Sequence, residues 1–305
     1  MSPRLRRVLT VARLAALLLG LPLLMWWLAR TAVLEAVSPG DLLLGVVLAL
    51  LAMLFYALRL RRVLAVVGIA LGRRETLRLA LLAMFYQCFV PFSVGGDLTK
   101  FVKLRARDHA AHTVAGAIVL DHALGATSLI VLAAASWWQL AIPGVPLVSL
   151  LGGSLVLAAL LAAAGLLLAA RWRPTRDLRT LLARARRRWP LLAGALVLSL
   201  IMHVTLAAAV WVASRDWGFA LDFTRVLAVF SVSALLQAVP VSVLGAGAAE
   251  LAGTGLYLAL GLPGAAALLM TSLFYSYRLI MALLGGLWDV LPEPGRDARR
   301  RTPAP

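Results

Sequence analysis

Six long apolar runs, each close to membrane-spanning length, leave this chain few ways to fold. A helix needs about 20 predominantly apolar residues to cross a hydrocarbon core of about 30 Å. Charged residues make up 14% of the sequence and cluster between the runs, whereas about a quarter of a soluble domain is charged. We therefore expect an all-α polytopic membrane protein with about six full spans. The predicted spans cover residues 8–29, 42–58, 113–137, 147–170, 191–213 and 265–290.

The basic residues are distributed as in a membrane protein whose basic loops face the cytoplasm. A net charge of +17 would suggest nucleic acid as the partner of a soluble protein. Here, however, 25 of the 30 Lys and Arg lie in five segments that can share one face of the membrane. Cytoplasmic loops carry such an excess, so we expect cytoplasmic N- and C-termini and no nucleic-acid partner. The five segments are residues 4–7, 59–78, 100–107, 171–188 and 296–301.

Two further apolar stretches, residues 79–104 and 224–262, fit this topology only as hairpins. A full crossing by the first would put residues 100–107 and the Arg-rich loop 171–188 outside the cell, against the charge rule. We therefore predict that residues 79–104 enter from the cytoplasm and return to it. The second stretch must begin and end outside, because the basic tail after residue 290 should be cytoplasmic. The prediction is eight hydrophobic helical units: six spans and two re-entrant hairpins.

The two predicted hairpins carry related motifs. Each contains the pattern V-P-x-S-V around Pro91 or Pro240, followed by glycines and then a carboxylate, Asp97 or Glu250. Inverted repeats with helices broken by Gly and Pro are typical of secondary transporters, whose binding sites lie where the breaks meet. We therefore expect a single transmembrane domain over residues 1–305, built from an inverted repeat. Its halves are approximately residues 1–137 and 147–290, and residues 291–305 form a disordered basic cytoplasmic tail.

The predicted helix breaks indicate an anion-binding site. Pro91 and Pro240 end their helices by removing a backbone donor. The helices that restart at Asp97 and near Ala248 present N–H groups that favour anions such as phosphate. One helix terminus contributes about 0.3–2 kcal/mol, whereas a charge at mid-bilayer costs about 3–17 kcal/mol, so both breaks, hydration and basic side chains must act together. The candidate substrate-binding residues are Pro91, Ser93, Gly95, Gly96, Asp97, Lys100, Lys103, Asp121, Pro240, Ser242, Gly245, Gly247, Glu250 and Arg278.

Structural roles compete with functional ones at several of these positions. Residues 100–107 are also typical of a juxtamembrane segment attracted to anionic lipids. Asp97 and Glu250 suit the first turns of their half-helices, where carboxylates are favoured. Asp121 lies within a predicted span, where ionisable residues are functional candidates by default. A structural ion pair between Asp121 and Arg278 explains both residues equally well.

We identify no catalytic set, metal site or cofactor motif in the sequence. Cys88 is the only cysteine, which excludes an intramolecular disulfide and a cysteine-based metal site. His203 is interpreted as a residue of a helix interface rather than as a proton carrier. The chain is therefore not expected to be an enzyme, although an intramembrane enzyme using Asp97, Asp121 and Glu250 stays open as an alternative.

The segments PFSVGGD at residues 91–97 and PVSVLGAGAAE at residues 240–250 resemble a known family. Both are similar to the motifs P-x-S-x-G-G-D and P-x-S-x-x-G-x-G-x-x-E of the flippase-like transmembrane domain of lysylphosphatidylglycerol synthases. The resemblance covers nearly the whole chain. It implies a free-standing member without the aminoacyltransferase domain of the full synthases, which would handle lipids without aminoacylating them.

Individual positions both support this resemblance and depart from it. The Asp within a span and the basic residue of the last helix, which the family carries, are matched by Asp121 and Arg278. The family commonly has Arg directly after that Asp and directly before the late Glu. This chain has His122 and Ala249 at those two positions.

The sequence and the resemblance together predict a membrane lipid translocase with anionic membrane lipids as its partners. The expected cargo is a phosphate-bearing lipid, either a phosphatidylglycerol derivative or a polyprenyl-phosphate-linked precursor. One alternative is a secondary transporter of a small anion. Another is a membrane enzyme or accessory subunit of envelope lipid or glycan assembly, with a lipid-modifying enzyme or a glycosyltransferase as a candidate partner. No cofactor is expected.

Overall fold

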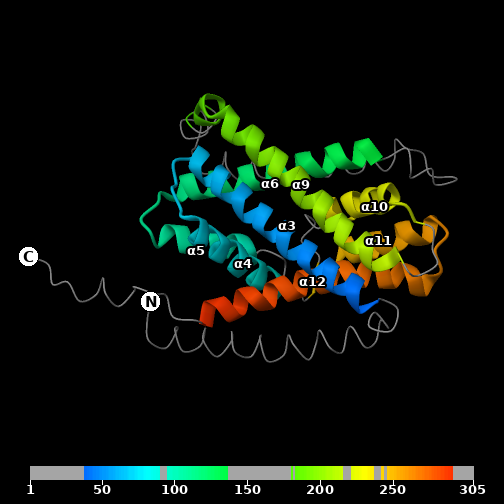
Figure 1. The fold of residues 1–305 in the computed structure, drawn as a ribbon. Helices are drawn as coiled ribbons and strands as arrows, with labels where there is room; N and C mark the ends of the chain where they lie inside the picture. The colour runs from blue at the N-terminus through cyan, green and yellow to red at the C-terminus, as the bar shows by residue number, and fades with distance from the viewer. Residues whose placement is uncertain are drawn as a thin grey trace, which may run out of the picture.

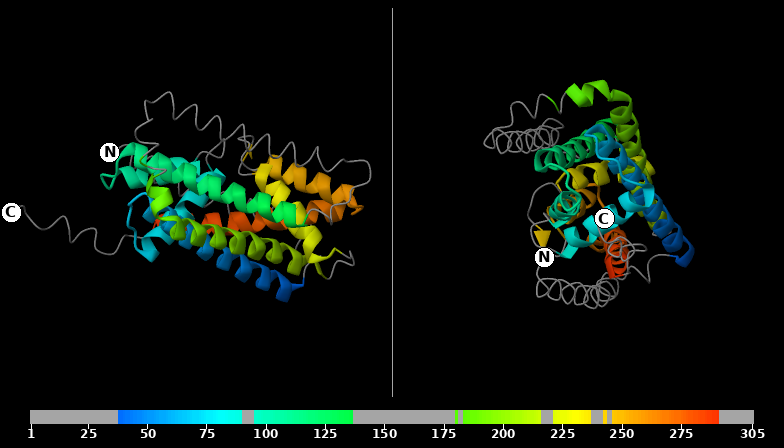
Figure 2. Two further views of the ribbon diagram at one scale, coloured as in Figure 1. Left: turned by 90° about the horizontal axis from the view of Figure 1, so that it is seen from above. Right: turned by 90° about the vertical axis from the view of Figure 1, so that its left-hand side faces the viewer.

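The computed structural model describes residues 38–89, 95–136, 180, 183–215, 221–236, 242–243 and 246–290, which are mostly helical (Figure 1). The long helices run roughly along one direction (Figure 2). The helices are α3 (Pro39–Val66), α4 (Arg73–Phe89), α5 (Gly95–Arg105), α6 (Ala111–Ser136), α9 (Trp189–Ser214), α10 (Phe223–Leu236), α11 (Ala248–Ala259) and α12 (Gly264–Val290). Two short strands, β1 (Ser242–Val243) and β2 (Ala246–Gly247), precede α11.

Within the described residues, four helices are long and apolar enough to cross a membrane: α3, α6, α9 and α12. They coincide with four of the six predicted spans. The other two, residues 8–29 and 147–170, lie outside the described residues, as does the predicted tail 291–305. The helical membrane fold is therefore confirmed, while the number of spans and the inverted repeat stay predictions.

Local sequence sets both ends of α3. Ser38 caps its N-terminus, where the side-chain oxygen accepts a hydrogen bond from the backbone N–H of Asp41 at 3.2 Å. At the other end Gly68 adopts a left-handed φ of 91° and completes a Schellman motif. The helix therefore continues beyond residue 58, where the predicted span ended, and Arg59 belongs to the helix instead of a cytoplasmic loop.

Helices α3 and α9 pack against each other in opposite directions (Figure 1). At one end, Arg184 before α9 donates a hydrogen bond to the carbonyl of Val67, just after α3, at 3.3 Å. At the other end, Arg215 follows α9 and pairs with Asp41 of α3 at 2.6 Å. We call the first end the basic end of the bundle, because the connections that carry Arg107 and Arg184 lie there.

Helices α4 and α5 form a hairpin that starts and finishes at the basic end. Arg107, just after α5, pairs with Glu75 at the start of α4 at 3.1 Å. The two helices pack closely at Gly96, where a Cβ atom would lie 2.9 Å from the carbonyl oxygen of Ala83. Residues 79–104, predicted to enter and return, therefore do turn back on themselves.

Helices α10 and α11 form a second hairpin whose ends lie away from the basic end. The segment entering α10 is bound to the C-terminal part of α9, because the indole of Trp211 donates to the carbonyl of Leu221 at 3.3 Å. After α11, Gly261 with a φ of 87° turns the chain into α12. Helix α12 then runs to the basic end, where Arg78 donates to the carbonyl of Trp288 at 3.4 Å. The two hairpins thus begin from opposite ends of the bundle.

The second motif contains local structure that its sequence did not reveal. Strands β1 and β2 pair antiparallel, with Ser242 opposite Gly247 and Val243 opposite Ala246. A strand hairpin, rather than an irregular segment alone, therefore leads into α11.

Helix α12 is the most buried of the four long apolar helices in the described part of the chain. Of its most apolar 18-residue window, 72% is buried, against 28% for α3. The outer side of α3 instead exposes large apolar residues such as Leu43, Val47 and Leu54. Exposed apolar side chains in rows of this kind suit contact with lipid chains.

Candidate functional site

The structure describes ten of the fourteen candidate residues. Pro91, Ser93, Pro240 and Gly245 lie outside the described residues. Gly95 and Gly96 are buried at the start of α5, and Lys103 lies in the last turn of that helix. Ser242 and Gly247 are in the strand hairpin. The remaining five candidates form two groups of ion pairs, one around Asp121 and one around Glu250.

The first group begins at the N-terminal turn of α5. Lys100 contacts Asp97, one turn earlier in α5, with 3.0 Å between Nζ and Oδ1. The other carboxylate oxygen of Asp97 lies 2.7 Å from Nε2 of His122 on α6. The side chain of Lys100 is 6% exposed, that of Asp97 36% and that of His122 62%. The Asp97–His122 contact therefore forms the accessible end of a group whose cation is buried.

Inside this entrance, Asp121 of α6 connects two cations. Lys100 approaches one carboxylate oxygen at 3.4 Å, and Arg59 of α3 approaches the other at 2.6 Å. Tyr56 donates a hydrogen bond to Asp121 at 3.4 Å. Arg59 and Asp121 are both almost fully buried. The alternative of an Asp121–Arg278 ion pair is wrong, because α6 presents Asp121 to α3 and α5.

Arg59 is the main site residue that the sequence analysis missed. Its position near the end of an apolar run suggested a cytoplasmic residue, but α3 continues to Val66. One signal was present: Tyr56 and Arg59 are three residues apart, and a helix through residue 58 would place them on one face. The partner of Arg59 is 62 positions away in sequence, so only the packing of α3 on α6 could reveal it.

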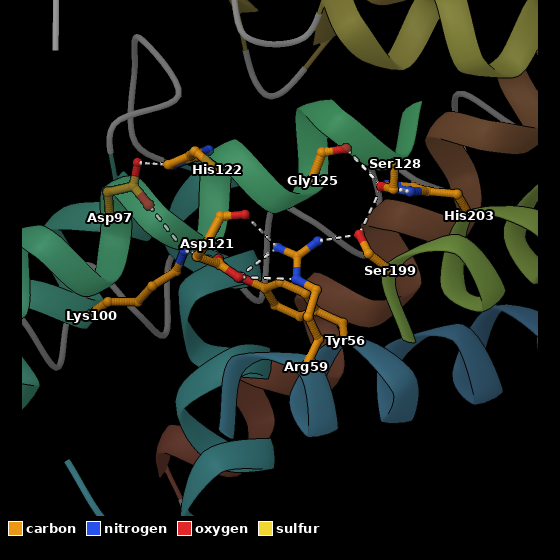
Figure 3. Close-up of polar contacts among 10 residues, drawn as sticks. All are labelled: Tyr56, Arg59, Asp97, Lys100, Asp121, His122, Gly125, Ser128, Ser199 and His203. Carbon is orange, nitrogen blue, oxygen red and sulfur yellow. Dashed lines mark hydrogen bonds and ion pairs between the residues drawn. The ribbon is translucent and has the colours of Figure 1, made fainter. Parts of the chain in front are cut away.

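A chain of polar side chains extends from Arg59 further into the bundle (Figure 3). Arg59 donates to Ser199 of α9 at 3.0 Å. Ser199 lies 2.8 Å from Ser128 of α6, which lies 2.9 Å from Nδ1 of His203. Gly125 leaves space for the guanidinium, since a Cβ atom there would lie 3.3 Å from Nη1 of Arg59. His203 therefore lies at a helix interface, as interpreted from the sequence.

Nine residues are connected by these contacts, and we call them the charged network (Figure 3). They are Tyr56, Arg59, Asp97, Lys100, Asp121, His122, Ser128, Ser199 and His203, with His122 at the accessible end. Its two permanent cations, Arg59 and Lys100, face the two carboxylates Asp97 and Asp121. The cations are therefore neutralised, and neither is a free anion-binding charge. Removing one charge from such a group leaves a buried charge without compensation, which is strongly unfavourable.

The second group joins the second hairpin to α12. Arg278 of α12 donates to Glu250 of α11 at 3.0 Å, and both side chains are largely buried. The guanidinium also lies over the ring of Phe274 at 5.7 Å. Glu250 was considered as a first-turn carboxylate, and it does lie in the first turn of α11. Its charge is paired with Arg278, the residue that was considered in the sequence analysis as a partner of Asp121.

The metal-ligating side chains do not gather anywhere in the described part of the chain. In that part of the chain, no group of three or more His, Cys, Asp or Glu is placed to hold a metal ion. Cys88 is buried and free of a disulfide. The charged network is instead suited to holding and exchanging single charges, since carboxylates and cations alternate along it.

The fold and these ion pairs define a polytopic helical membrane protein with paired charges inside its bundle. The chain belongs to the family described as lysylphosphatidylglycerol synthase TM region, whose model matches residues 11–286. This finding confirms the resemblance carried by the two motifs, and it gives the protein a membrane lipid-related role. No curated protein matches the chain.

Proposed function

We propose that this protein moves a phosphate-bearing lipid between the leaflets of a bacterial cytoplasmic membrane, with the basic end of its bundle in the cytoplasm. The cargo is a phosphatidylglycerol derivative or a polyprenyl-phosphate-linked precursor. One observation carries the proposal: a partly exposed carboxylate, Asp97, forms an ion pair with a buried cation, Lys100, whose other ion pair among the described residues is with Asp121.

The surroundings of Asp97 favour an amphiphilic ligand over a soluble one. Leu98 and Val102 on α5 and Val119 on α6 are each more than half exposed. Val119 lies one turn from His122, so both residues occupy the same side of α6. A polar entrance bordered by exposed apolar side chains suits a headgroup whose acyl chains stay in the bilayer.

The energetics require a compensated path for the headgroup. A bare charge at the centre of a bilayer costs about 3–17 kcal/mol, far more than one charge-assisted hydrogen bond of about 1.5–3 kcal/mol returns. A network that already contains balanced charges can accept an anion by exchanging partners, without creating an unpaired charge. Translocation driven by the lipid gradient or an ion gradient requires no catalytic step, so we propose transport rather than an enzymatic reaction.

A leaflet-accessibility assay tests this function. Purified protein is reconstituted into liposomes with a trace of fluorescent phosphatidylglycerol, and a membrane-impermeant reductant then quenches the outer label. We expect wild-type protein to expose the inner label as well. Lys100→Met should slow this exposure by about tenfold or more, because it removes a charge-assisted contact of about 1.5–3 kcal/mol.

The matched control is Glu75→Gln, which removes an exposed ion pair at the basic end and should leave the rate unchanged. If wild-type protein exposes no inner label, translocation of this lipid is excluded. If counterflow of a soluble phosphate occurs instead, the protein is an anion transporter.

A further inference from the structure

The two carboxylates that neutralise Lys100 differ in how firmly they are held. Asp121 is almost fully buried and receives hydrogen bonds from Arg59 and Tyr56. Asp97 is partly exposed and receives its other contact from His122, a residue that is itself mostly exposed. Asp97 is therefore the one described carboxylate of the network that can leave Lys100 without disrupting the helix packing.

The geometry of Asp97 allows this departure to be partial. Its Oδ1 faces Lys100 at 3.0 Å, while its Oδ2 faces His122 at 2.7 Å. The two oxygens thus contact different partners on different helices. Rotation of the Asp97 side chain away from Lys100 can retain the contact with His122, so the carboxylate stays hydrogen-bonded when Lys100 is released.

We propose that Asp97 occupies the place of the lipid phosphate on Lys100, and that the phosphate of the cargo displaces it during transport. This inference rests on the proposed function and assigns the contact inside it. The phosphate oxygens take the position of Oδ1 on Lys100, and the displaced carboxylate remains on His122. Asp121 keeps its contacts throughout and holds Lys100 in place.

The charge balance of the network limits which phosphates fit. Arg59 and Lys100 are matched by Asp97 and Asp121, so only one negative charge is replaced when Asp97 moves away. A phosphodiester carries a single charge, so it replaces the carboxylate of Asp97 on Lys100 one for one. A diphosphate would bring additional negative charge next to Asp121, which is unfavourable for a buried group. The site therefore selects a lipid with one singly charged phosphodiester.

Measuring lipid binding to the Asp97→Asn variant distinguishes displacement of Asp97 from a role in which Asp97 itself binds the lipid. The variant removes the competing anion and leaves Lys100 in excess of carboxylate. Purified protein in a neutral detergent is titrated with phosphatidylglycerol, and binding is measured as the shift of the thermal unfolding midpoint. We expect Asp97→Asn to reach half-saturation at about tenfold lower phosphatidylglycerol than wild type, and to move the lipid more slowly at saturation.

Three further ligands test which part of the lipid the site recognises. Diacylglycerol, which lacks the phosphate, should give no shift with either protein. Glycerophosphoglycerol, which is the headgroup without acyl chains, separates a soluble anion from a lipid. A lipid carrying a diphosphate headgroup should bind more weakly than phosphatidylglycerol. Lys100→Met should lose the phosphatidylglycerol-dependent shift, whereas Asp97→Glu should bind like wild type because it restores the competing carboxylate.

The results decide the inference independently of the proposed function. If Asp97→Asn binds phosphatidylglycerol no more tightly than wild type, displacement is excluded, even if the wild type moves lipid between leaflets. If binding tightens but the wild type moves no lipid, the phosphate site stands and translocation fails. If Asp97→Asn does not fold, the Lys100→Met variant provides the test of the inference. An unchanged phosphatidylglycerol-dependent shift of its unfolding midpoint would exclude Lys100 as the residue that contacts the phosphate.

Discussion

At the scale of single residues, the charged network depends most on Arg59. Its guanidinium donates to the carboxylate of Asp121 through two nitrogens, at 2.6 and 3.0 Å, and to Ser199 through the third. Arginine cannot release its proton in a protein, so this residue interrupts any proton path from Asp97 towards His203. The buried part of the network therefore positions Asp121 and Lys100, and the proposed exchange of charge involves only the accessible end.

Arg59→Met should lower the free energy of unfolding by about 3–5 kcal/mol, because removing one member of a buried ion pair leaves its partner poorly compensated. The double variant Arg59→Met/Asp121→Leu should be more stable than the single variant, since it removes both charges. Equilibrium unfolding in detergent measures both. Arg107→Ala, which breaks an exposed pair, should change stability by less than about 1 kcal/mol. Equal stability of Arg59→Met and wild type would contradict the structural role.

At the scale of elements, α12 and α4 approach so closely that only glycine fits at their contact. A Cβ atom on Gly285 would lie 2.0 Å from the carbonyl oxygen of Leu81, a backbone atom that cannot move aside easily. Small residues permit such close packing between membrane helices. This contact connects the first hairpin to the helix that carries Arg278, so it holds the two groups of ion pairs within one bundle.

Gly285→Ala should therefore destabilise the protein by about 1–3 kcal/mol, the range expected for overpacking. Gly255→Ala in α11 is the matched substitution, because nothing lies within 4 Å of a Cβ atom there. It should be neutral or stabilise the helix by up to about 1 kcal/mol. Thermal unfolding midpoints of the two variants test the contrast, and similar midpoints would argue against the close approach of α4 and α12.

At the scale of the whole molecule, the basic connections that the structure describes gather at one end of the bundle. The ends of the first hairpin, the C-terminal end of α3 and the start of α9 all lie there. The ion pair Arg215–Asp41 marks the opposite end. Since basic loops stay in the cytoplasm, we predict that this end of the bundle faces the cytoplasm.

Cysteine labelling in intact cells tests this orientation. In a Cys88→Ala background, cysteines replacing the exposed Arg107 and Arg187 should react only after the membrane is permeabilised. A cysteine at Asp222 should react with an impermeant reagent from outside. If positions 107 and 187 were both labelled from outside, the first hairpin would have to be a full crossing, and the predicted inverted repeat would be wrong.

Much of the architecture follows from the order of residues along the chain. The length of an apolar run decides whether a helix can cross, and the sign of its flanking charges decides its direction. The spans at α6, α9 and α12 and the return of residues 79–104 were predicted on these grounds. Pro and Gly likewise mark where helices stop, because they alter backbone geometry at their own positions.

The partners inside the bundle were decided only by the tertiary structure. The sequence indicated Asp121 and Arg278 as intramembrane charges but allowed them to pair, whereas packing joins Asp121 to Arg59 and Arg278 to Glu250. The choice depends on how far each helix is rotated and shifted against its neighbours. That rotation comes from close contacts between helices distant in sequence, such as α3 with α6 and α11 with α12, which no local pattern of residues specifies.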